Sequence, residues 1–413
     1  MKRGQKMQEN VLIVAVQKQT DDENRLHYSI EELQSLIETA DGSVVDIVMQ
    51  KRDHPHPALY LGSGKLEEIT TLIDELEVDI IIANDELSAT QMRNLQKHLD
   101  VPVIDRSQLI LDIFANRAQT KEGKLQVELA QYKYMLPRLH GQGQALSRLG
   151  GGIGTRGPGE TKLETDRRHI NRRIDEIKAK LETVVNQRAQ YRKRRKTNKA
   201  FQIAIVGYTN AGKSTLFNRL TKSDAFEQDQ LFATLDPMSR QMQFPSGLRA
   251  IVTDTVGFMQ DLPTALIAAF RSTLEEVTEA DFIYHVVDAA HPDHRQHQAT
   301  VVKLLQDLKA DQIPMLTVFN KKDLLTEAFI PSTHPSIIAS AYDQIDRKRM
   351  LEKTEELLKE HWEFYHTVVS ADEGKKLQLF KQHTIMEKDE FDPEIEAYRL
   401  EGYMPTDHPL HFR

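Results

Sequence analysis

A strand-like run, a glycine-containing loop and a helical pattern follow one another from Phe201 onward, and they constrain this chain more than any other feature. Phe201–Val206 reads FQIAIV, an apolar run typical of a buried strand. Gly207–Ser214 then reads GYTNAGKS, which fits G-x-x-x-x-G-K-[ST] in the strand–loop–helix context that this pattern requires. Backbone N–H groups of such a loop converge on phosphate. The sequence therefore predicts an α/β domain that binds a nucleoside triphosphate.

The residues of this loop have separate expected tasks. Gly207 and Gly212 permit the tight turn. Lys213 should reach the β- and γ-phosphate oxygens and take part in catalysis, and the Ser214 hydroxyl should ligate Mg²⁺. The other nucleotide contacts that we expect from the loop are Asn210, Ala211 and Thr215.

A second motif indicates which base is bound. Met315–Phe319 is another strand-like run, and it ends in Asn320-Lys321-Lys322-Asp323, the N-K-x-D motif with which Ras-like GTPases bind guanine. The Asp323 carboxylate would accept hydrogen bonds from N1–H and the N2 amino group of guanine. Adenine offers neither donor there, and a buried polar group left unpaired costs about 1–3 kcal/mol. We expect Asn320 to belong to the same site and Lys321 to cover the ring face.

A further strand-like run, Ser336–Ala339, leads to Ser340-Ala341-Tyr342. These residues resemble the S-A-K/L element that places a backbone N–H near O6 of guanine, although the third position departs from the commonest form. We therefore add Ser340 and Ala341 to the expected base site.

Two segments between these motifs are expected to contact the γ-phosphate. The strand-like run Ala250–Thr253 is followed by Asp254-Thr-Val-Gly257, which resembles D-x-x-G. Asp254 would hold Mg²⁺ through a water, and the Gly257 N–H would bond the γ-phosphate during catalysis. Upstream, Thr234 lies between the P-loop and D-x-x-G, where a switch threonine ligates Mg²⁺. Four elements in this order predict binding of GTP or GDP with Mg²⁺, and hydrolysis of GTP.

The residue after Gly257 is Phe258, at a position where Ras-like proteins often carry the glutamine that orients the attacking water. Phenylalanine cannot hydrogen-bond to water. Intrinsic hydrolysis should therefore be slow, and we hypothesise that a bound partner reorders the switches to complete the site.

Strand-like and helical patterns alternate near the N-terminus and again from Phe201 onward. The N-terminal stretch predicts a small parallel sheet with flanking helices, in the order β-α-β-α-β-α-β. Its expected elements are Val11–Val16, Ile30–Thr39, Val44–Met49, Leu66–Leu76, Asp79–Ala83, Ser88–Leu99 and Val101–Ile104. We expect four domains: an N-terminal α/β domain over 1–120, a helical arm over 121–199, a Ras-like GTPase domain over 200–361 and a small α+β domain over 362–413.

The arm is predicted to be an antiparallel helical hairpin. Lys121–Leu139 carries apolar residues at spacings of 4, 3, 4 and 3, and a similar stripe runs from Leu163 to Tyr191. Pro137 should end or kink the first helix near its tip. The loop over 141–160 has 8 glycines in 20 residues and contains two arginines before its first acid. It could be a flexible linker, but glycines on a stalk also let backbone amides approach phosphates closely.

Charge is unevenly distributed along the chain. From 160 to 199 there are 14 Lys/Arg and 6 Asp/Glu, a net charge of +8, so the remainder of a chain of net charge −8 carries −16. The basic segment, which includes the run RKRRK at 192–196, is either a polyanion contact or a solvated helix face. There is no cysteine and no apolar stretch of membrane-spanning length, so we expect a cytoplasmic protein without disulfides or membrane insertion.

Taken together, the motifs resemble the HflX family of translation-associated GTPases. The resemblance is carried by GYTNAGKSTLFNRL at 207–220, DQLFATLDP at 229–237, DTVGF-x-x-DLP at 254–263 and the glycine segment at 147–168, and it extends over about residues 10–330. DTVGF is the family's own form, so Phe258 is a family trait. The family's fold, an N-terminal α/β domain with a helical arm followed by a GTPase domain and a small C-terminal domain, agrees with the organisation predicted above.

The resemblance implies a ribosomal partner and a role in splitting stalled or idle ribosomes. The partner would be the large subunit, with no DNA partner and no need for a dimer. Ribosomal RNA near the peptidyl-transferase centre would be contacted by Arg148, Gly150, Gly151, Gly152, Gly154, Arg156 and Gly157. The arm itself would lie along rRNA phosphates with Arg167, Arg168, Arg172 and Arg173.

Three other readings remain open from the sequence. The protein could be an assembly factor that uses GTP to check immature large subunits, or a scaffold GTPase that docks anionic lipid through 192–196. No amphipathic apolar face accompanies that run, which argues against the lipid reading. Separately, Leu61–Lys65 reads LGSGK before a helix and could bind an anion, although it lacks the full P-loop spacing.

Overall fold

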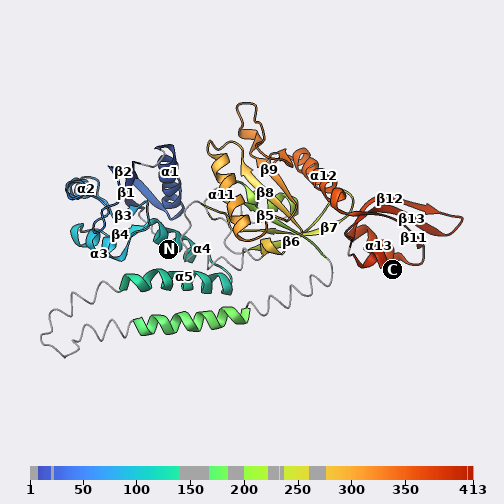
Figure 1. Ribbon diagram of the computed structural model, residues 1–413, viewed down its shortest axis with the longest axis horizontal. Helices are drawn as coiled ribbons and strands as arrows, with labels where there is room; N and C mark the ends of the chain where they lie inside the picture. Colours follow the sequence, from blue (N-terminus) through green and yellow to red (C-terminus); the bar gives the residue numbers. More distant parts are fainter. Residues whose placement is uncertain are drawn as a thin grey trace, which may run out of the picture. The chain divides into compact units, whose positions relative to one another are not determined.

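The computed structural model describes residues 8–19, 23–139, 167–184, 200–221, 232, 237–259, 276–406 and 408–412 (Figure 1). These residues fall into two compact units, one ending at Val184 and the other beginning at 200. Each unit is described by itself below.

The first unit is built on a four-stranded parallel sheet in the order β2-β1-β3-β4. Its strands are β1 (Glu9–Lys18), β2 (Gly42–Arg52), β3 (Ile80–Ala83) and β4 (Val103–Asp105). The apolar run of β1 lies inside this sheet and is buried along its length from Val11 to Val16. The small parallel sheet that the alternation of patterns predicted is confirmed.

Four helices accompany this sheet: α1 (Glu23–Thr39), α2 (Ser63–Glu75), α3 (Ala89–His98) and α4 (Arg106–Arg117). Ser88 caps α3, in a capping box with Gln91. Helix α4 begins at once after β4 and was not predicted from the sequence. Asp105 ends that strand and also caps the helix, since its carboxylate accepts from the Gln108 N–H at 2.8 Å. Because no loop separates the strand from the helix, no turn residues mark the point where the strand-like sequence pattern changes to a helical one.

Two packed helices form the predicted hairpin. The helix α5 (Lys121–Leu139) and a helix over 167–184 lie side by side (Figure 1). Their stripes meet in one apolar cluster that includes Leu125, Leu129, Ile170, Ile174 and Ile177. The structure therefore confirms the stripe assignment, whereas α5 does not end before Pro137 but runs on to Leu139.

Arg138 ties the far end of α5 to the N-terminal sheet. Its Nη2 donates to the Leu87 carbonyl at 2.7 Å and lies 3.3 Å from carboxylate oxygens of both Asp105 and Glu86. Asp105 is fully buried, and burial raises the pKa of its carboxyl, so the guanidinium supplies the opposite charge that this group needs. Arg138 also lies over the Tyr134 ring, 3.4 Å from its centroid.

The second unit contains a six-stranded sheet in the order β10-β9-β8-β5-β7-β6, in which only β6 is antiparallel to its neighbour. The strands are β5 (Phe201–Gly207), β6 (Met238–Gln243), β7 (Arg249–Asp254), β8 (Phe282–Asp288), β9 (Met315–Asn320) and β10 (Ser336–Ile338). The helices are α8 (Lys213–Thr221), α11 (His294–Asp307), α12 (Gln344–His361) and the short η1 (Lys322–Leu324). This is the predicted P-loop α/β fold.

A three-stranded antiparallel sheet follows α12, in the order β11-β13-β12. It consists of β11 (Glu363–Ser370), β12 (Ile385–Asp392) and β13 (Ala397–Met404), with α13 (Gly374–His383) packed on it and η2 (Pro409–Phe412) after it. The small α+β appendage is therefore confirmed. It shares the core of the larger sheet, because Ile385 is buried there and Trp362 packs edge-on against Phe201 at 5.5 Å.

Candidate functional site

The predicted nucleotide-binding residues gather at one edge of the six-stranded sheet. The parallel strands β5, β7 and β9 end at Gly207, Asp254 and Asn320, and β10 ends two residues before Ser340. Because the carboxyl ends of parallel strands lie at the same edge, residues far apart in sequence meet there. The close contacts described below join all four strand ends.

Two glycines of the P-loop stand where no side chain fits. A Cβ at Gly207 would lie 2.2 Å from the Val286 carbonyl oxygen of β8. A Cβ at Gly212 would lie 2.2 Å from Asn320 Nδ2, and Gly212 also has φ of +90°. The close approach of the loop to β8 and β9 therefore explains both glycines of the motif.

Lys213, Ser214 and Asp254 lie together behind this loop. The Ser214 hydroxyl donates to Asp254 Oδ2 at 2.7 Å, so the two oxygens expected to serve one Mg²⁺ are neighbours. Lys213 is buried, and its Nζ donates to the Tyr208 carbonyl at 2.7 Å. Burial lowers the pKa of Lys213 to about 8, although nearby Asp254 opposes the shift. The cluster thus contains a cation, which phosphate binding requires, and a carboxylate, which metal binding requires.

Replacing Lys213 with methionine should stabilise the protein while it abolishes GTP binding. The buried ammonium has a pKa of about 8 in the folded chain and 10.5 as its ordinary value. Unfolding therefore takes up a proton between these pH values, and the cost of burying the charge is full below pH 8 and vanishes towards pH 10.5. Lys213→Met should therefore raise the free energy of unfolding by about 2–3 kcal/mol at pH 7.

Urea unfolding of nucleotide-stripped protein at pH 7 and pH 9.5 measures the difference in unfolding free energy between Lys213→Met and the parent. We expect it to shrink at the higher pH. A methionine variant that is less stable than the parent at pH 7 would contradict the expectation.

Asn320 links the phosphate and base halves of the site. Its Nδ2 donates to the Ala211 carbonyl at 2.9 Å, and its Oδ1 accepts from the Ala341 N–H at 2.9 Å. One buried amide thus holds the P-loop against the segment after β10. Sequence reasoning placed Asn320 in the site but did not foresee this bridge.

The lysine and aspartate of N-K-x-D are also held in place. Lys321 has φ of +61°, and its Nζ lies 2.8 Å from Asp288 Oδ2 at the end of β8. Asp323 lies on η1 and accepts from the Ser340 hydroxyl at 2.5 Å. The partner Asp288 lay outside the predicted site, because nothing in its own sequence neighbourhood marks it.

In the Ser340–Ala341 segment, the backbone N–H groups of the element predicted to approach O6 of guanine already have acceptors. The Ser340 N–H donates to Asp346 Oδ2 at 3.0 Å, and the Ala341 N–H donates to Asn320. If either backbone N–H also donated to a base, its hydrogen would be shared between the base and the acceptor that it already has. The segment is nevertheless placed firmly, since Asp346 is buried and also binds Lys322 at 3.1 Å.

Phe258 is bound to the P-loop through its backbone. Its N–H donates to the Gly207 carbonyl at 3.1 Å, and its carbonyl accepts from the Thr209 N–H at 2.7 Å. The side chain is only 3% exposed. Gly257 is just as confined, because a Cβ there would lie 2.9 Å from Thr209 Cγ2 and 3.0 Å from Lys213 Nζ.

A histidine-rich stretch lies against the P-loop and was not singled out from the sequence. The Tyr208 ring stacks on His297 of α11, with centroids 3.7 Å apart and planes within 6°. The ring centroid of His291 lies 4.4 Å from that of His297. On β8, His285 is buried, and burial followed by the charge of Lys213 lowers its pKa to about 4. Four histidines between 285 and 297 were the available signal.

Some of the predicted residues lie outside the described part of the chain. They are the switch residue Thr234 and the loop residues Arg148, Gly150, Gly151, Gly152, Gly154, Arg156 and Gly157. On the hairpin, Arg173 pairs with Glu128 at 2.8 Å and Arg172 lies 3.8 Å from Glu176, so both arginines already have acidic neighbours. Within the described residues, no helix is both long and apolar enough to cross a membrane.

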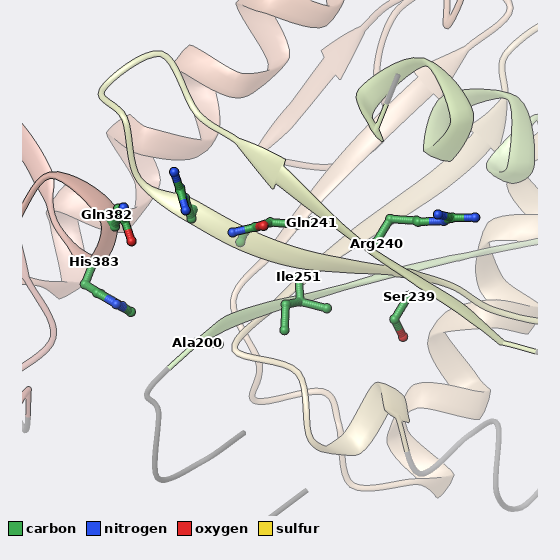
Figure 2. Close-up of a pocket in the computed structure, with 9 residues that line it drawn as sticks. Ala200, Ser239, Arg240, Gln241, Ile251, Gln382 and His383 are labelled. Atoms are coloured by element: carbon green, nitrogen blue, oxygen red, sulfur yellow. The ribbon is translucent and has the colours of Figure 1, made fainter. Parts of the chain in front are cut away.

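A cavity of about 500 Å³ lies away from this site, along β6 and β7 (Figure 2). Its lining comes from these two strands, from Ala200 and from the end of α13 at Gln382 and His383. None of the residues predicted for nucleotide binding lines it. This cavity is therefore separate from the predicted nucleotide site.

Three family models match the chain in succession. Residues 27–115 match the GTP-binding GTPase N-terminal model, 117–195 match the GTP-binding GTPase middle region, and 202–321 match a model described as 50S ribosome-binding GTPase. Among solved structures, the complex of SsGBP with GDP is 23% identical with a TM-score of 0.49, covering 84% of this chain and 98% of that chain.

Curated relatives match over nearly the whole chain. GTPase HflX of Alkalihalophilus pseudofirmus is 56% identical over 396 residues, which is 96% of this chain and 93% of that protein. GTPase HflX of Caldanaerobacter subterraneus subsp. tengcongensis is 48% identical over 93% of this chain and 89% of that protein. GTPase HflX of Escherichia coli is 44% identical over 72% and 70% respectively.

Proposed function

Because the chain belongs to the GTPase HflX family and is accordingly a P-loop GTPase, we propose that it binds the large ribosomal subunit and separates stalled or idle ribosomes into subunits. Hydrolysis of GTP to GDP and phosphate would control its release. The observation that carries this proposal is the presence, in one chain, of the candidate nucleotide site at the edge of the six-stranded sheet and a hairpin of two packed helices.

The geometry supports a Mg²⁺-dependent reaction with named ligands. Ser214 and Asp254, whose oxygens are 2.7 Å apart, would hold the ion directly and through a water, and Thr234 would supply a further oxygen. Lys213 and the Gly257 N–H would contact the phosphates. Asp323 and Lys321 would select and cover guanine.

Two observations support a large-subunit partner. The model matched by residues 202–321 is described as a 50S ribosome-binding GTPase. Residues 160–199, which include the second helix of the hairpin, carry a net charge of +8, which suits contact with rRNA phosphates. The loop with Arg148, Arg156 and the glycines between 150 and 157 would reach rRNA from the hairpin tip. The protein would act as a cytoplasmic monomer.

The test compares GTP hydrolysis by the purified protein alone, with small subunits and with large subunits, in one buffer at physiological salt. We expect large subunits alone to raise the rate at least about tenfold, because a partner would order the switches around a site that lacks the usual glutamine. No stimulation of protein that binds GTP would remove the ribosome as activator and leave the GTPase assignment standing.

An assembly factor is the alternative, since the same hairpin could probe immature particles. Sedimentation distinguishes the two functions. A splitting factor should convert joined ribosomes into subunits in the presence of GTP, whereas an assembly factor should leave them joined and prefer precursor particles.

A further inference from the structure

Thr209, the third residue of the P-loop, carries a buried hydroxyl for which the described residues offer no hydrogen-bond partner. The residue is 7% exposed. An unpaired buried hydroxyl costs about 1–3 kcal/mol, and buried polar groups are nearly always paired. Valine or alanine would avoid this cost, so the hydroxyl calls for a specific explanation.

The position of Thr209 suggests what that explanation is. Its Cγ2 and Cα lie 2.9 and 3.0 Å from the point where a Cβ on Gly257 would stand, and Lys213 Nζ lies 3.0 Å from the same point. The Gly257 N–H and the Lys213 ammonium are the two groups expected to contact the γ-phosphate. The Thr209 side chain therefore lies at the γ-phosphate end of the loop.

The neighbouring Phe258 cannot position the attacking water. Its side chain has no polar atom, and its N–H and carbonyl are already bonded to Gly207 and Thr209. A polar group near the γ-phosphate must come from elsewhere, and Thr209 is adjacent.

We propose that the Thr209 hydroxyl takes the place of the missing glutamine and holds the water that attacks the γ-phosphate. A hydroxyl can accept a hydrogen bond from the water and donate one to a γ-phosphate oxygen. In the structure the methyl group faces Gly257, and rotation about the Cα–Cβ bond to another staggered position brings the hydroxyl to the place that the methyl now occupies.

The hydrolytic step balances with water as the only co-reactant. The water oxygen bonds to the γ-phosphorus, the bond from that phosphorus to the β–γ bridging oxygen breaks, and its electron pair leaves with GDP. The proton lost by the water passes to the phosphate oxygens. This inference concerns hydrolysis alone and does not depend on the ribosomal partner.

A structural role and a catalytic role for Thr209 predict opposite orders of variants. Thr209→Val keeps the shape and removes the hydroxyl, whereas Thr209→Ser keeps the hydroxyl and removes the methyl that packs on Gly257. If the Thr209 side chain only fills space, Thr209→Val should hydrolyse GTP at least as fast as the parent, and Thr209→Ser should hydrolyse it more slowly. If the hydroxyl holds water, serine should retain hydrolysis and valine should lose it.

Single-turnover hydrolysis of GTP by excess full-length protein measures this, with fluorescent GTP and GDP analogues giving the affinities separately. We expect Thr209→Val to slow hydrolysis about 100-fold with affinities within about threefold of the parent, and Thr209→Ser to stay within about threefold in both. Hydrolysis by Thr209→Val at the parent rate would overturn the proposal, as would equal loss in the valine and serine variants. If Thr209→Val does not fold or bind GTP, Thr209→Ala replaces it and must lose the rate that Thr209→Ser keeps.

Discussion

Gly212→Ala should lose GTP binding by at least about 100-fold. The new Cβ would lie 2.2 Å from Asn320 Nδ2, well inside van der Waals contact, at a residue whose φ is +90°. An L-residue forced into such a backbone conformation costs about 1–3 kcal/mol, and Asn320 would have to move as well. Binding of the phosphates holds the loop in this conformation, so the strain weakens affinity. At about 1.4 kcal/mol per factor of ten, a cost of about 3 kcal/mol is roughly 100-fold, and the displacement of Asn320 adds to it.

The reason for so large an effect is that Asn320 is a shared support. Its amide holds the Ala211 carbonyl on one side and the Ala341 N–H on the other. Displacing it loosens the phosphate loop and the base-binding segment together. We therefore expect GTP and GDP affinity to fall together, whereas a defect limited to the γ-phosphate would spare GDP.

Gly64→Ala is the matched control, because it makes the same change in the other glycine-containing segment before a helix. A Cβ at Gly64 meets nothing within 4 Å, and the residue lies in the first turn of α2. Nucleotide affinity should not change, and helix propensity favours alanine by up to about 1 kcal/mol. Titration with a fluorescent GTP analogue compares the two variants. A Gly212→Ala protein that binds within threefold of the parent would show that the loop can shift freely.

Local spacing was enough to locate the P-loop and its two glycines, whereas the roles of Lys213 and Ser214 stay predictions. Gly207, Gly212, Lys213 and Ser214 follow from one eight-residue pattern after a strand, because backbone and phosphate impose fixed requirements on that loop. The parallel sheets could be predicted for a similar reason, since apolar runs alternate with helical periodicity. The apolar stripes of the hairpin likewise meet as their spacing requires.

Contacts between distant segments could not be predicted in this way. Asp288 supports Lys321 from the end of β8, and Tyr208 stacks on His297 of α11, yet neither pair is marked by a pattern within its own segment. Such pairs depend on which strands are neighbours in the sheet, and that order becomes visible only in the folded chain. Helix α4 was missed for a different reason, because Asp105 ends a strand and caps the helix without a loop between them.

Asp323→Asn should change the base preference from guanine to xanthine. The carboxylate of Asp323 accepts from the Ser340 hydroxyl at 2.5 Å and has further lone pairs for two donors on guanine. An asparagine amide offers one acceptor and one NH₂ donor, so the N2 amino group of guanine would face another donor. Xanthine has a carbonyl oxygen at that position and restores the pair. Ser340 can still donate to the amide oxygen.

GTP affinity should fall about 10²–10⁴-fold, because a site built around hydrogen bonds strongly rejects a ligand that leaves them unpaired. Xanthosine triphosphate should then bind more tightly than GTP. Asp311→Asn is the control, since it removes the same charge from an exposed position just before β9 and should leave both affinities as they are.

Competition of GTP and xanthosine triphosphate against a fluorescent analogue measures the ratio directly. If Asp323→Asn lost both nucleotides equally, the aspartate would act by holding Ser340 and the segment after β10 and would not read the base. If Asp323→Asn instead bound xanthosine triphosphate more tightly than GTP, Asp323 would contact the base directly. Only a group in contact with the base can change which purine is preferred.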